Sequence, residues 1–547
     1  MKTIRKVFVL TLMLAMMLAS ALTGVYAASY APGATVVANS SSPSGYSVHF
    51  VYDGGGASDI AKVQVTGPFN YLSVTSDLKE SMANGSTKVY TPDEYVNGMY
   101  ATNLYPDATG AIKAGYTKDM TLDSTTGYYE TSFPITSGSF AYSYIVTYLD
   151  GTSKTIMDPA NKTRFNGNSD IDTGDLTHST VYGAYDAKKQ SKSLDLSYVN
   201  EATKNQGEVT YVEYKGSLSN HQDLGIYLPA SYNSKRAEGY KVIYASHGGG
   251  GNETDWFAMG KANNIMDNLI NADSSKEAIV VTMDNASYKW DFAKIEDNVL
   301  NYIIPYMEKH YNVSTAVQDR AFCGLSMGGM TTTHMYFDHP EAFGYFGVFS
   351  GSDNTAFKTA SDALKKPYVM TMAGTADIAS KTIMEAPVGK KIEDLVSYFK
   401  TNSMTNYVDY GLVPGSHDWF TWAQAFHAFA GSVAFSKNST ASTTTPTAPT
   451  TTKVTAPGKT VIKSLKSQSK KKLTVTYKKV TEATGYQIAY KKTTSKTWKT
   501  TTTSRLTKTI SKLSRKKKYA VKVRSYKTVS GKKYYSAYTS SKTIKIK

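Results

Sequence analysis

The chain has 547 residues and a net charge of +17, but that charge is unevenly distributed. Residues 453–547 contain 28 Lys and Arg and one acid, Glu482, which gives +27, so residues 1–452 carry −10. The length predicts several domains, and the two regions are expected to have different partners. The single cysteine, Cys323, excludes an internal disulfide, and its apolar neighbours favour a buried, inert thiol over a nucleophile.

Residues 1–27 have the layout of a secretory signal peptide. Basic residues at the start precede a short apolar stretch, and small residues follow, ending at Ala27. The sequence therefore predicts a secreted protein whose mature chain begins near Ala28. No later stretch is apolar for long enough to predict a membrane span.

Residues 28–190 alternate apolar and polar positions in short runs such as KVQVTGPF and FAYSYIVTYLD, which predicts a β domain. The runs lead to the turn Asp158-Pro159-Ala160, and the segment resembles an early-set immunoglobulin-like domain. Domains of that kind can bind sugars through flat aromatic faces. Because this segment contains no Trp, a structural role beside the next domain is the favoured interpretation over sugar binding.

Residues 191–437 alternate apolar strands with helical runs, which predicts a mostly parallel sheet wrapped by helices, the α/β-hydrolase fold class. One predicted helix places four apolar residues at spacings of four: Ile295, Val299, Ile303 and Met307. Reactive groups in such a sheet gather beyond the carboxyl ends of the strands.

A nucleophile is predicted where the strand RAFCGL turns into a helix through Gly324-x-Ser326-x-Gly328. The glycine-rich loop HGGGGN follows another buried strand, so an oxyanion hole is expected from the backbone amides of Met327 and of Gly249 or its neighbour Gly250. A phosphate-binding loop is the alternative, but the Lys-Ser/Thr ending it requires is missing. We expect no metal and no cofactor.

The general base and the acid are predicted from chain order, since α/β-hydrolases place serine before acid before histidine. His417 follows a strand in VPGSHDWF, whereas His427 lies in a helical run, so His417 is preferred. Asp377, just past the strand PYVMTMAG, is the preferred acid. Asp353 after the preceding strand and Asp418 beside the histidine are its competitors.

A Ser/Thr/Pro tract at residues 438–460 predicts a linker. Residues 461–547 alternate like a small β-sandwich and resemble a fibronectin type III module, with Tyr486 and Ile488 on one inward face and Tyr519, Val521 and Val523 on another. The charge of this module predicts binding to an anionic cell-wall polymer, with a merely solvated surface as the alternative. Nucleic acid is not the expected partner of an exported protein.

Four ordered motifs, HGGGGNETDW, GLSMGGM, AGTAD and PGSHDWFTW, together resemble carbohydrate esterase family one, the esterase D or feruloyl esterase group. The resemblance implies that Ser326, His417 and Asp377 act through an acyl-enzyme on feruloyl or acetyl esters of plant xylan. Trp256 and Trp290 are the candidates for lining the substrate cleft, with packing in the core or at its rim as the alternative. We expect a feruloyl esterase of arabinoxylan, with an acetyl-xylan esterase or a non-catalytic carbohydrate-binding or adhesion protein as alternatives.

Overall fold

A computed structural model describes residues 30–73, 89–102, 105–106, 112–113, 115–161, 179–377, 391–436, 456–467, 470–481, 483–529 and 532–547. The predicted signal peptide and most of the predicted linker lie outside these residues. The chain forms two compact units, the first including Lys88–Tyr407 and Gly411–Phe435, and the second including Ser436–Lys547. The predicted boundary between residues 190 and 191 falls inside the first unit.

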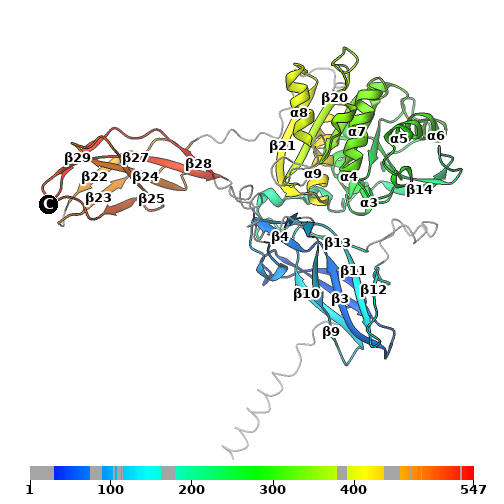
Figure 1. The fold of residues 1–547 in the computed structure, drawn as a ribbon, viewed down its shortest axis with the longest axis horizontal. Helices are drawn as coiled ribbons and strands as arrows, with labels where there is room; N and C mark the ends of the chain where they lie inside the picture. The colour runs from blue at the N-terminus through cyan, green and yellow to red at the C-terminus, as the bar shows by residue number, and fades with distance from the viewer. Residues whose placement is uncertain are drawn as a thin grey trace, which may run out of the picture. The chain divides into compact units, whose positions relative to one another are not determined.

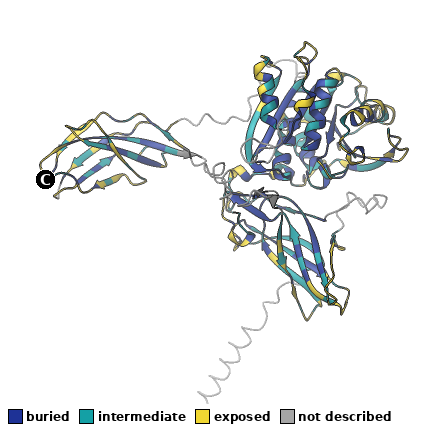
Figure 2. Cartoon of the chain, viewed as in Figure 1, coloured by how far each residue is buried: buried dark blue, intermediate teal, exposed yellow. Residues whose placement is uncertain are grey.

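The centre of the first unit is an eight-stranded sheet of the α/β-hydrolase type (Figure 1). Its middle pairs, from β17 to β20, are parallel, and β15 joins β14 and β17 antiparallel. Figure 2 shows that its strands are largely buried, as expected for a sheet covered on both faces. In spatial order the strands are β14 (Glu208–Tyr214), β15 (Gln222–Leu228), β17 (Ile279–Met283), β16 (Val242–Ser246), β18 (Arg320–Leu325), β19 (Tyr345–Phe349), β20 (Tyr368–Ala376) and β21 (Tyr407–Ser416).

Helices cover both faces of this sheet. Val348 of β19 belongs to one buried cluster with residues of α5 to α8, while its neighbour Phe349 packs on Phe429, just after α9. Because successive strand residues point to opposite faces, α9 lies on the face away from α7. The helices are α3 (Asp255–Ala258), α4 (Ala262–Ala272), α5 (Phe292–Asn298), α6 (Ile304–His310), α7 (Met327–Asp338), α8 (Ile392–Thr401) and α9 (Trp419–Ala428).

The predicted helix with apolar spacings of four is interrupted by a π-helical turn at Val299–Ile303, between α5 and α6. Pro305 near the start of α6 has no N–H with which to continue the α-helical hydrogen bonding, which explains the change of pitch. The four apolar residues are nevertheless all fully buried, as the spacing predicts: Ile295, Val299, Ile303 and Met307.

Glu296 of α5 is a buried carboxyl whose Oε2 lies 3.7 Å from Nε2 of His339, and it makes stability depend on pH. Burial, followed by repulsion from Asp338, raises the pKa of Glu296 from 4.5 to about 8. The unfolded chain loses this proton near pH 4.5, whereas the folded chain keeps it to about pH 8. The free energy of unfolding therefore falls as the pH rises from about 4.5 to about 8. We expect Glu296→Gln to stabilise the domain at pH 8 relative to the parent by on the order of 3 kcal/mol, and far less at pH 4.

Urea unfolding followed by tryptophan fluorescence at pH 4 and pH 8 measures this difference. Glu341→Gln is the matched control, because the side chain of Glu341 is 73% exposed. Equal effects of the two substitutions at both pH values would contradict the assignment.

The first unit also contains the β domain predicted near its amino terminus. Its four-stranded sheet has the order β1 (Gly33–Ala38), β2 (Tyr46–Asp53), β10 (Tyr128–Pro134) and β9 (Thr121–Leu122). A second sheet has the order β12 (Ser153–Ile156), β11 (Gly138–Tyr148), β3 (Ile60–Gly67) and β8 (Tyr116–Asp119), with β13 (Ser179–Gly183) also pairing with β11. Short pairs are formed by β4 (Asn70–Ser73) with β5 (Met99–Thr102), and by β6 (Tyr105–Pro106) with β7 (Ile112–Lys113).

One aromatic core is shared by these two sheets, with Phe50 and Phe133 from the first and Tyr142 from the second. Asp158, in the predicted turn, is buried and accepts hydrogen bonds from the hydroxyls of Tyr142 (2.7 Å) and Tyr144 (3.1 Å). The turn therefore fixes the end of this core, and the early-set assignment remains a prediction.

The second unit is built from two sheets around a separate core. One sheet has the order β22 (Ile462–Lys466), β23 (Leu473–Tyr477) and β26 (Thr507–Ile510). The other has the order β25 (Lys499–Thr503), β24 (Gly485–Lys492), β27 (Lys518–Val529) and β28 (Lys532–Tyr535), with β29 (Lys542–Lys545) also paired to β27.

The five inward residues predicted for this module are buried, but they do not form two opposing faces. Because β24 pairs with β27, Tyr486 and Ile488 lie beside Val521 and Val523 on one sheet. The opposing face comes from the three-stranded sheet, through Leu473, Val475 and Tyr477. The fibronectin type III assignment remains a prediction.

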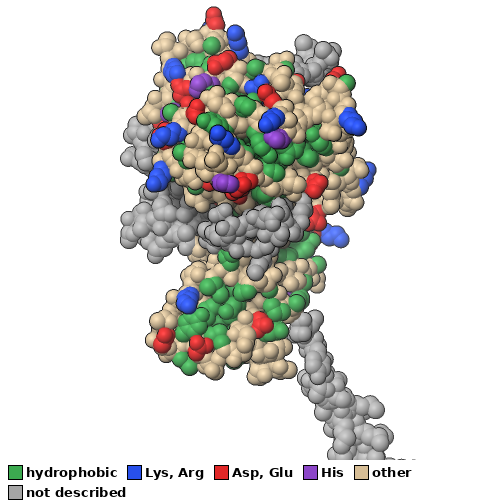
Figure 3. All heavy atoms as spheres, turned by 90° about the vertical axis from the view of Figure 1, so that its right-hand side faces the viewer, with side chains coloured by type: hydrophobic (Ala, Val, Ile, Leu, Met, Phe, Trp, Pro, Cys, Tyr) green, Lys and Arg blue, Asp and Glu red, His purple; other side chains and the backbone are tan. Residues whose placement is uncertain are grey.

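The first unit belongs to residues 1–452, which carry a net charge of −10. On the face drawn in Figure 3, basic and acidic side chains are intermixed. None of the helices in the described part of the chain is long and apolar enough to cross a membrane.

Candidate active site

Ser326 lies at the sharp bend between β18 and α7. Its backbone has φ 53° and ψ −115°, a conformation that L-residues rarely adopt. The flanking glycines are needed because a Cβ on Gly324 would lie 2.2 Å from the carbonyl oxygen of Gly328, and one on Gly328 would lie 2.4 Å from that of Ser246. The strand, the bend and the helix therefore pack too closely for side chains, and the bend holds the hydroxyl of Ser326 at the carboxyl edge of the sheet.

The side chains of Ser326, His417 and Asp377 form one hydrogen-bonded chain. The Oγ of Ser326 is 2.9 Å from Nε2 of His417, and Nδ1 of His417 is 2.9 Å from Oδ1 of Asp377. A carboxylate only accepts hydrogen bonds, so Nδ1 carries the proton and Nε2 is left to accept from the serine hydroxyl. Asp377 is fully buried. The arrangement can remove a proton from Ser326 and steady the imidazole that receives it.

The competing acids have other partners. Asp353 accepts hydrogen bonds from the backbone N–H and the hydroxyl of Thr355, where it caps the short helix η9 (Asn354–Ala356). Asp418 caps α9 through the N–H of Thr421 (3.1 Å) and accepts from the hydroxyl of Ser416 (2.5 Å). Burial raises the pKa of Asp418 to about 6. Both carboxyls thus hold local backbone in place.

His427 is a helix residue, as its pattern predicts. It lies in α9 and stacks on the ring of Tyr198 with 3.8 Å between the ring centroids. Burial lowers the pKa of His427 to about 4. This ring therefore packs against a neighbouring segment instead of meeting Ser326.

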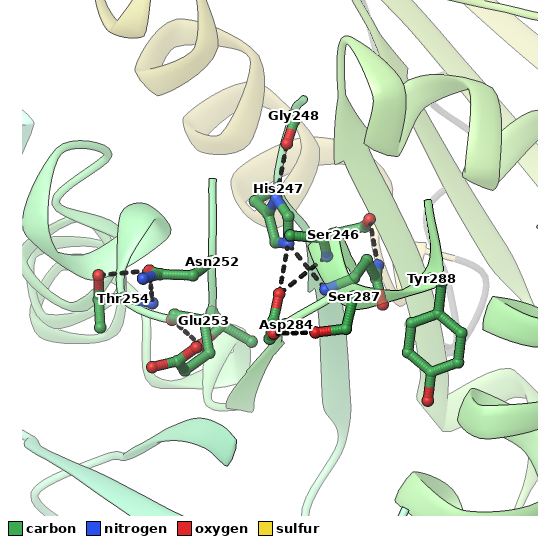
Figure 4. Close-up of polar contacts among 12 residues, drawn as sticks. Ser246, His247, Gly248, Asn252, Glu253, Thr254, Asp284, Ser287 and Tyr288 are labelled. Atoms are coloured by element: carbon green, nitrogen blue, oxygen red, sulfur yellow. Dashed lines mark hydrogen bonds and ion pairs between the residues drawn. The ribbon is translucent and has the colours of Figure 1, made fainter. Parts of the chain in front are cut away.

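The glycine loop after β16 lies against the nucleophile, because a Cβ on Gly248 would be 3.3 Å from Cβ of Ser326. His247 anchors this loop from beneath (Figure 4). Its Nε2 accepts the N–H of Asn285 at 2.8 Å, so its Nδ1 carries the proton and donates to the carbonyl of Gly248 at 2.6 Å. The buried ring of His247 thus fixes the first peptide of the loop, a role that the sequence did not indicate.

The predicted oxyanion residues come from the helix start that follows Ser326 and from the glycine loop after β16. Met327 is the first residue of α7, where backbone N–H groups have no acceptor within the helix. Gly249 and Gly250 follow the anchored Gly248, and Gly250 has φ 76°, the left-handed region that favours glycine. An oxyanion beside Ser326 would meet the positive end of α7 from one side and the loop from the other.

The prediction that Trp256 lines the cleft is wrong. This side chain is fully buried in α3, donates from Nε1 to the carbonyl of Ser246 at 3.0 Å and packs against Trp419. Trp290, by contrast, is 52% exposed, and a Cβ on Gly249 would lie 3.1 Å from its ring. The ring of Trp422 packs edge to face against the ring of His417, with 5.1 Å between the ring centroids.

A pocket of about 560 Å³ within the first unit adjoins the glycine loop and the histidine loop. Residues 249–252 and Trp419 line it from the hydrolase domain, while Gly138 and Tyr142 of β11 line it from the β domain. The sequence had favoured a purely structural role for that domain, but its strand β11 also forms part of this pocket wall.

Residues 216–432 match the family model described as "Putative esterase". An endo-1,4-beta-xylanase/feruloyl esterase of Xylanibacter ruminicola is 36% identical over 159 residues, which cover 27% of this chain and 22% of the relative. Endo-1,4-beta-xylanase Y of Acetivibrio thermocellus is 28% identical over 182 residues, which cover 30% of this chain and 16% of the relative. This chain thus spans about a fifth or less of the length of these two relatives.

Among solved structures, a ferulic acid esterase of the anaerobic fungus Anaeromyces mucronatus is similar, with 20% identity and a TM-score of 0.37, covering 43% of this chain and 93% of that chain. The matched region of the family model contains β15 to β21, the bend at Ser326 and the loop of His417. Residues 216–432 are thus similar to an esterase family, and their central site has the serine, histidine and aspartate arrangement of a serine hydrolase.

Proposed function

We propose that this chain is a secreted serine carboxylesterase that hydrolyses esters on plant cell-wall polysaccharide, and that its preferred substrates are feruloyl esters of arabinoxylan. The hydrogen-bonded chain of Ser326, His417 and Asp377 carries the proposal, because it supplies a nucleophile, a base and an orienting carboxylate in series. The match of residues 216–432 to an esterase family supports the reaction class.

The reaction follows from these contacts. The Oγ of Ser326 attacks the ester carbonyl carbon while Nε2 of His417 takes the hydroxyl proton, and the N–H groups of Met327 and Gly249 stabilise the oxyanion. Collapse of the tetrahedral intermediate breaks the bond to the sugar oxygen, which takes the proton from His417. A water molecule then attacks the acyl-enzyme by the same route in reverse, releasing the acid and restoring Ser326.

The feruloyl preference is supported by two observations. The relative from Xylanibacter ruminicola is named for feruloyl esterase activity. Trp290 also exposes about half its surface beside Gly249, where an aromatic acyl group attached to Ser326 could stack on it. The pocket walled by β11 offers room for the sugar portion.

The first experiment is a panel of methyl ferulate, feruloylated arabinoxylan, acetylated xylan and short-chain aryl esters, measured with the parent and with Ser326→Ala. We expect release of ferulate to exceed release of acetate. Faster release of acetate would make the chain an acetyl-xylan esterase. A parent that binds xylan yet hydrolyses none of the esters would contradict the proposed function altogether.

Trp290→Ala should raise KM for methyl ferulate about tenfold, the size expected for one lost aromatic contact. KM for a short-chain acetyl ester should stay at the parent value, because an acetyl group has no ring to stack. Trp290→Phe is the control that restores a ring. Equal changes in KM for both esters would remove Trp290 from the proposed acyl site.

A further inference from the structure

Six side chains on the second unit form a continuous row of contacts between cations and aromatic rings, which we name the cation–aromatic stripe. Nζ of Lys522 lies 4.4 Å from the ring centroid of Trp498 and 4.5 Å from that of Tyr538. Cζ of Arg524 lies 4.5 Å from the ring of Tyr538 and 3.8 Å from that of Tyr535. Lys491 extends the row, with Nζ 5.1 Å from the ring of Trp498.

The register of the five-stranded sheet places this stripe on its outer face. In β27, Lys522 and Arg524 alternate with Val521 and Val523, which belong to the core. On the neighbouring strand, Gln487 lies opposite Arg524. Each of the six stripe residues is partly exposed, so rings and cations together face solvent: Lys491, Trp498, Lys522, Arg524, Tyr535 and Tyr538.

The centre of the stripe is held rigidly. Oε1 of Gln487 accepts a hydrogen bond from Nε of Arg524 at 2.8 Å and another from the hydroxyl of Tyr538 at 2.7 Å. One amide oxygen thus fixes a guanidinium and a ring beside each other before any ligand arrives, which lowers the entropy lost on binding.

We propose that the cation–aromatic stripe is a binding site for a uronic-acid-bearing polysaccharide. The C–H faces of pyranose rings stack on Trp498 and Tyr538, and the carboxylates of the same sugars pair with Lys522 and Arg524. Charge complementarity supports this occupant, because residues 453–547 contain 28 basic residues and one acid. The site would hold the esterase domain on the acidic fraction of the cell wall, and this purpose rests on the proposed function.

Alternation of rings with cations distinguishes this ligand from other polyanions. A polyphosphate polymer offers charge but no ring faces, so the basic surface alone would suffice to bind it. Single-stranded nucleic acid offers both, and it is therefore the competing ligand in the test.

Binding of the full chain to polygalacturonate, measured by isothermal titration calorimetry at low salt, tests the site. The double variant Trp498→Ala/Tyr538→Ala should weaken binding about tenfold or more while leaving binding to polyphosphate unchanged. Lys522→Gln/Arg524→Gln should weaken binding more than Lys463→Gln/Lys466→Gln, which removes the same charge from exposed positions of β22 in the other sheet. Trp498→Tyr, which keeps a ring, should retain most of the affinity.

Three results would overturn the proposal: polygalacturonate affinity unchanged in the aromatic variant, equal losses in the two charge variants, or tighter binding of single-stranded DNA than of polygalacturonate. Hydrolysis of a soluble aryl ester is measured in every variant and should match the parent. Failure of the parent to hydrolyse any ester would reject the proposed function and leave this binding result standing by itself.

Discussion

Ser326→Ala is expected to lower kcat for every ester substrate by about 10⁶-fold, as removal of the nucleophile does in other hydrolases with such a triad. The loss is large because the acyl-enzyme cannot form without Oγ, which lies 2.9 Å from Nε2 of His417. Alanine and serine both have a Cβ, so the steric cost of φ 53° is the same in the variant and the parent. The melting temperature should therefore stay near that of the parent.

Ser350→Ala is the matched control for this substitution. Ser350 follows the neighbouring strand β19, is buried and also has a positive φ, of 52°. The structure gives its hydroxyl no part in the proton path, so kcat should be retained. Initial rates with an activated aryl ester, and the burst of aryl alcohol in the first turnover, measure both variants. A burst that persists in Ser326→Ala would place the nucleophile elsewhere.

Asp377→Asn is expected to lower kcat by about 10⁴-fold while leaving KM near the parent value, as the equivalent change does in other triad enzymes. The amide N–H of asparagine can donate a hydrogen bond to Nδ1 of His417, which favours the tautomer with its proton on Nε2. That nitrogen then cannot accept the proton of Ser326. The defect lies in the base, so binding of substrate is spared.

Asp353→Asn separates this role from that of the competing carboxyl. Asp353 accepts from the N–H and the hydroxyl of Thr355, and an asparagine oxygen can accept in the same way. We therefore expect kcat near the parent value for Asp353→Asn. A loss with Asp353→Asn that matched the loss with Asp377→Asn would contradict the assignment of Asp377 as the orienting acid.

The choice between these two acids shows why part of the site needed the fold. Asp353 and Asp377 follow consecutive parallel strands, β19 and β20, so sequence position alone puts both at the same edge of the sheet. In space β20 is the neighbour of β21, which carries the chain to His417, and β19 is one strand further away. The strand order therefore brings Asp377 to the imidazole.

The two tryptophans near the glycine loop show the same limit. The sequence proposed both for the substrate cleft and gave no sign of their different burial. Trp256 lies in α3, where contacts with Trp419 and Phe426 enclose it. Trp290 has φ 66° in a bend before α5 and remains half exposed. Burial depends on which segments fold over a residue, and those segments are distant in the chain.

The sequence by itself determined the features that depend on local chemistry: the alternation of strands and helices, the bend at Ser326 that its glycines permit, and the division of charge near residue 453. The tertiary structure decided which carboxyl meets His417, which tryptophan faces solvent, and how Lys522 and Arg524 come to lie between aromatic rings. Periodicity and turn chemistry are set within a few residues, whereas these contacts arise from strand order and register between segments far apart in the chain.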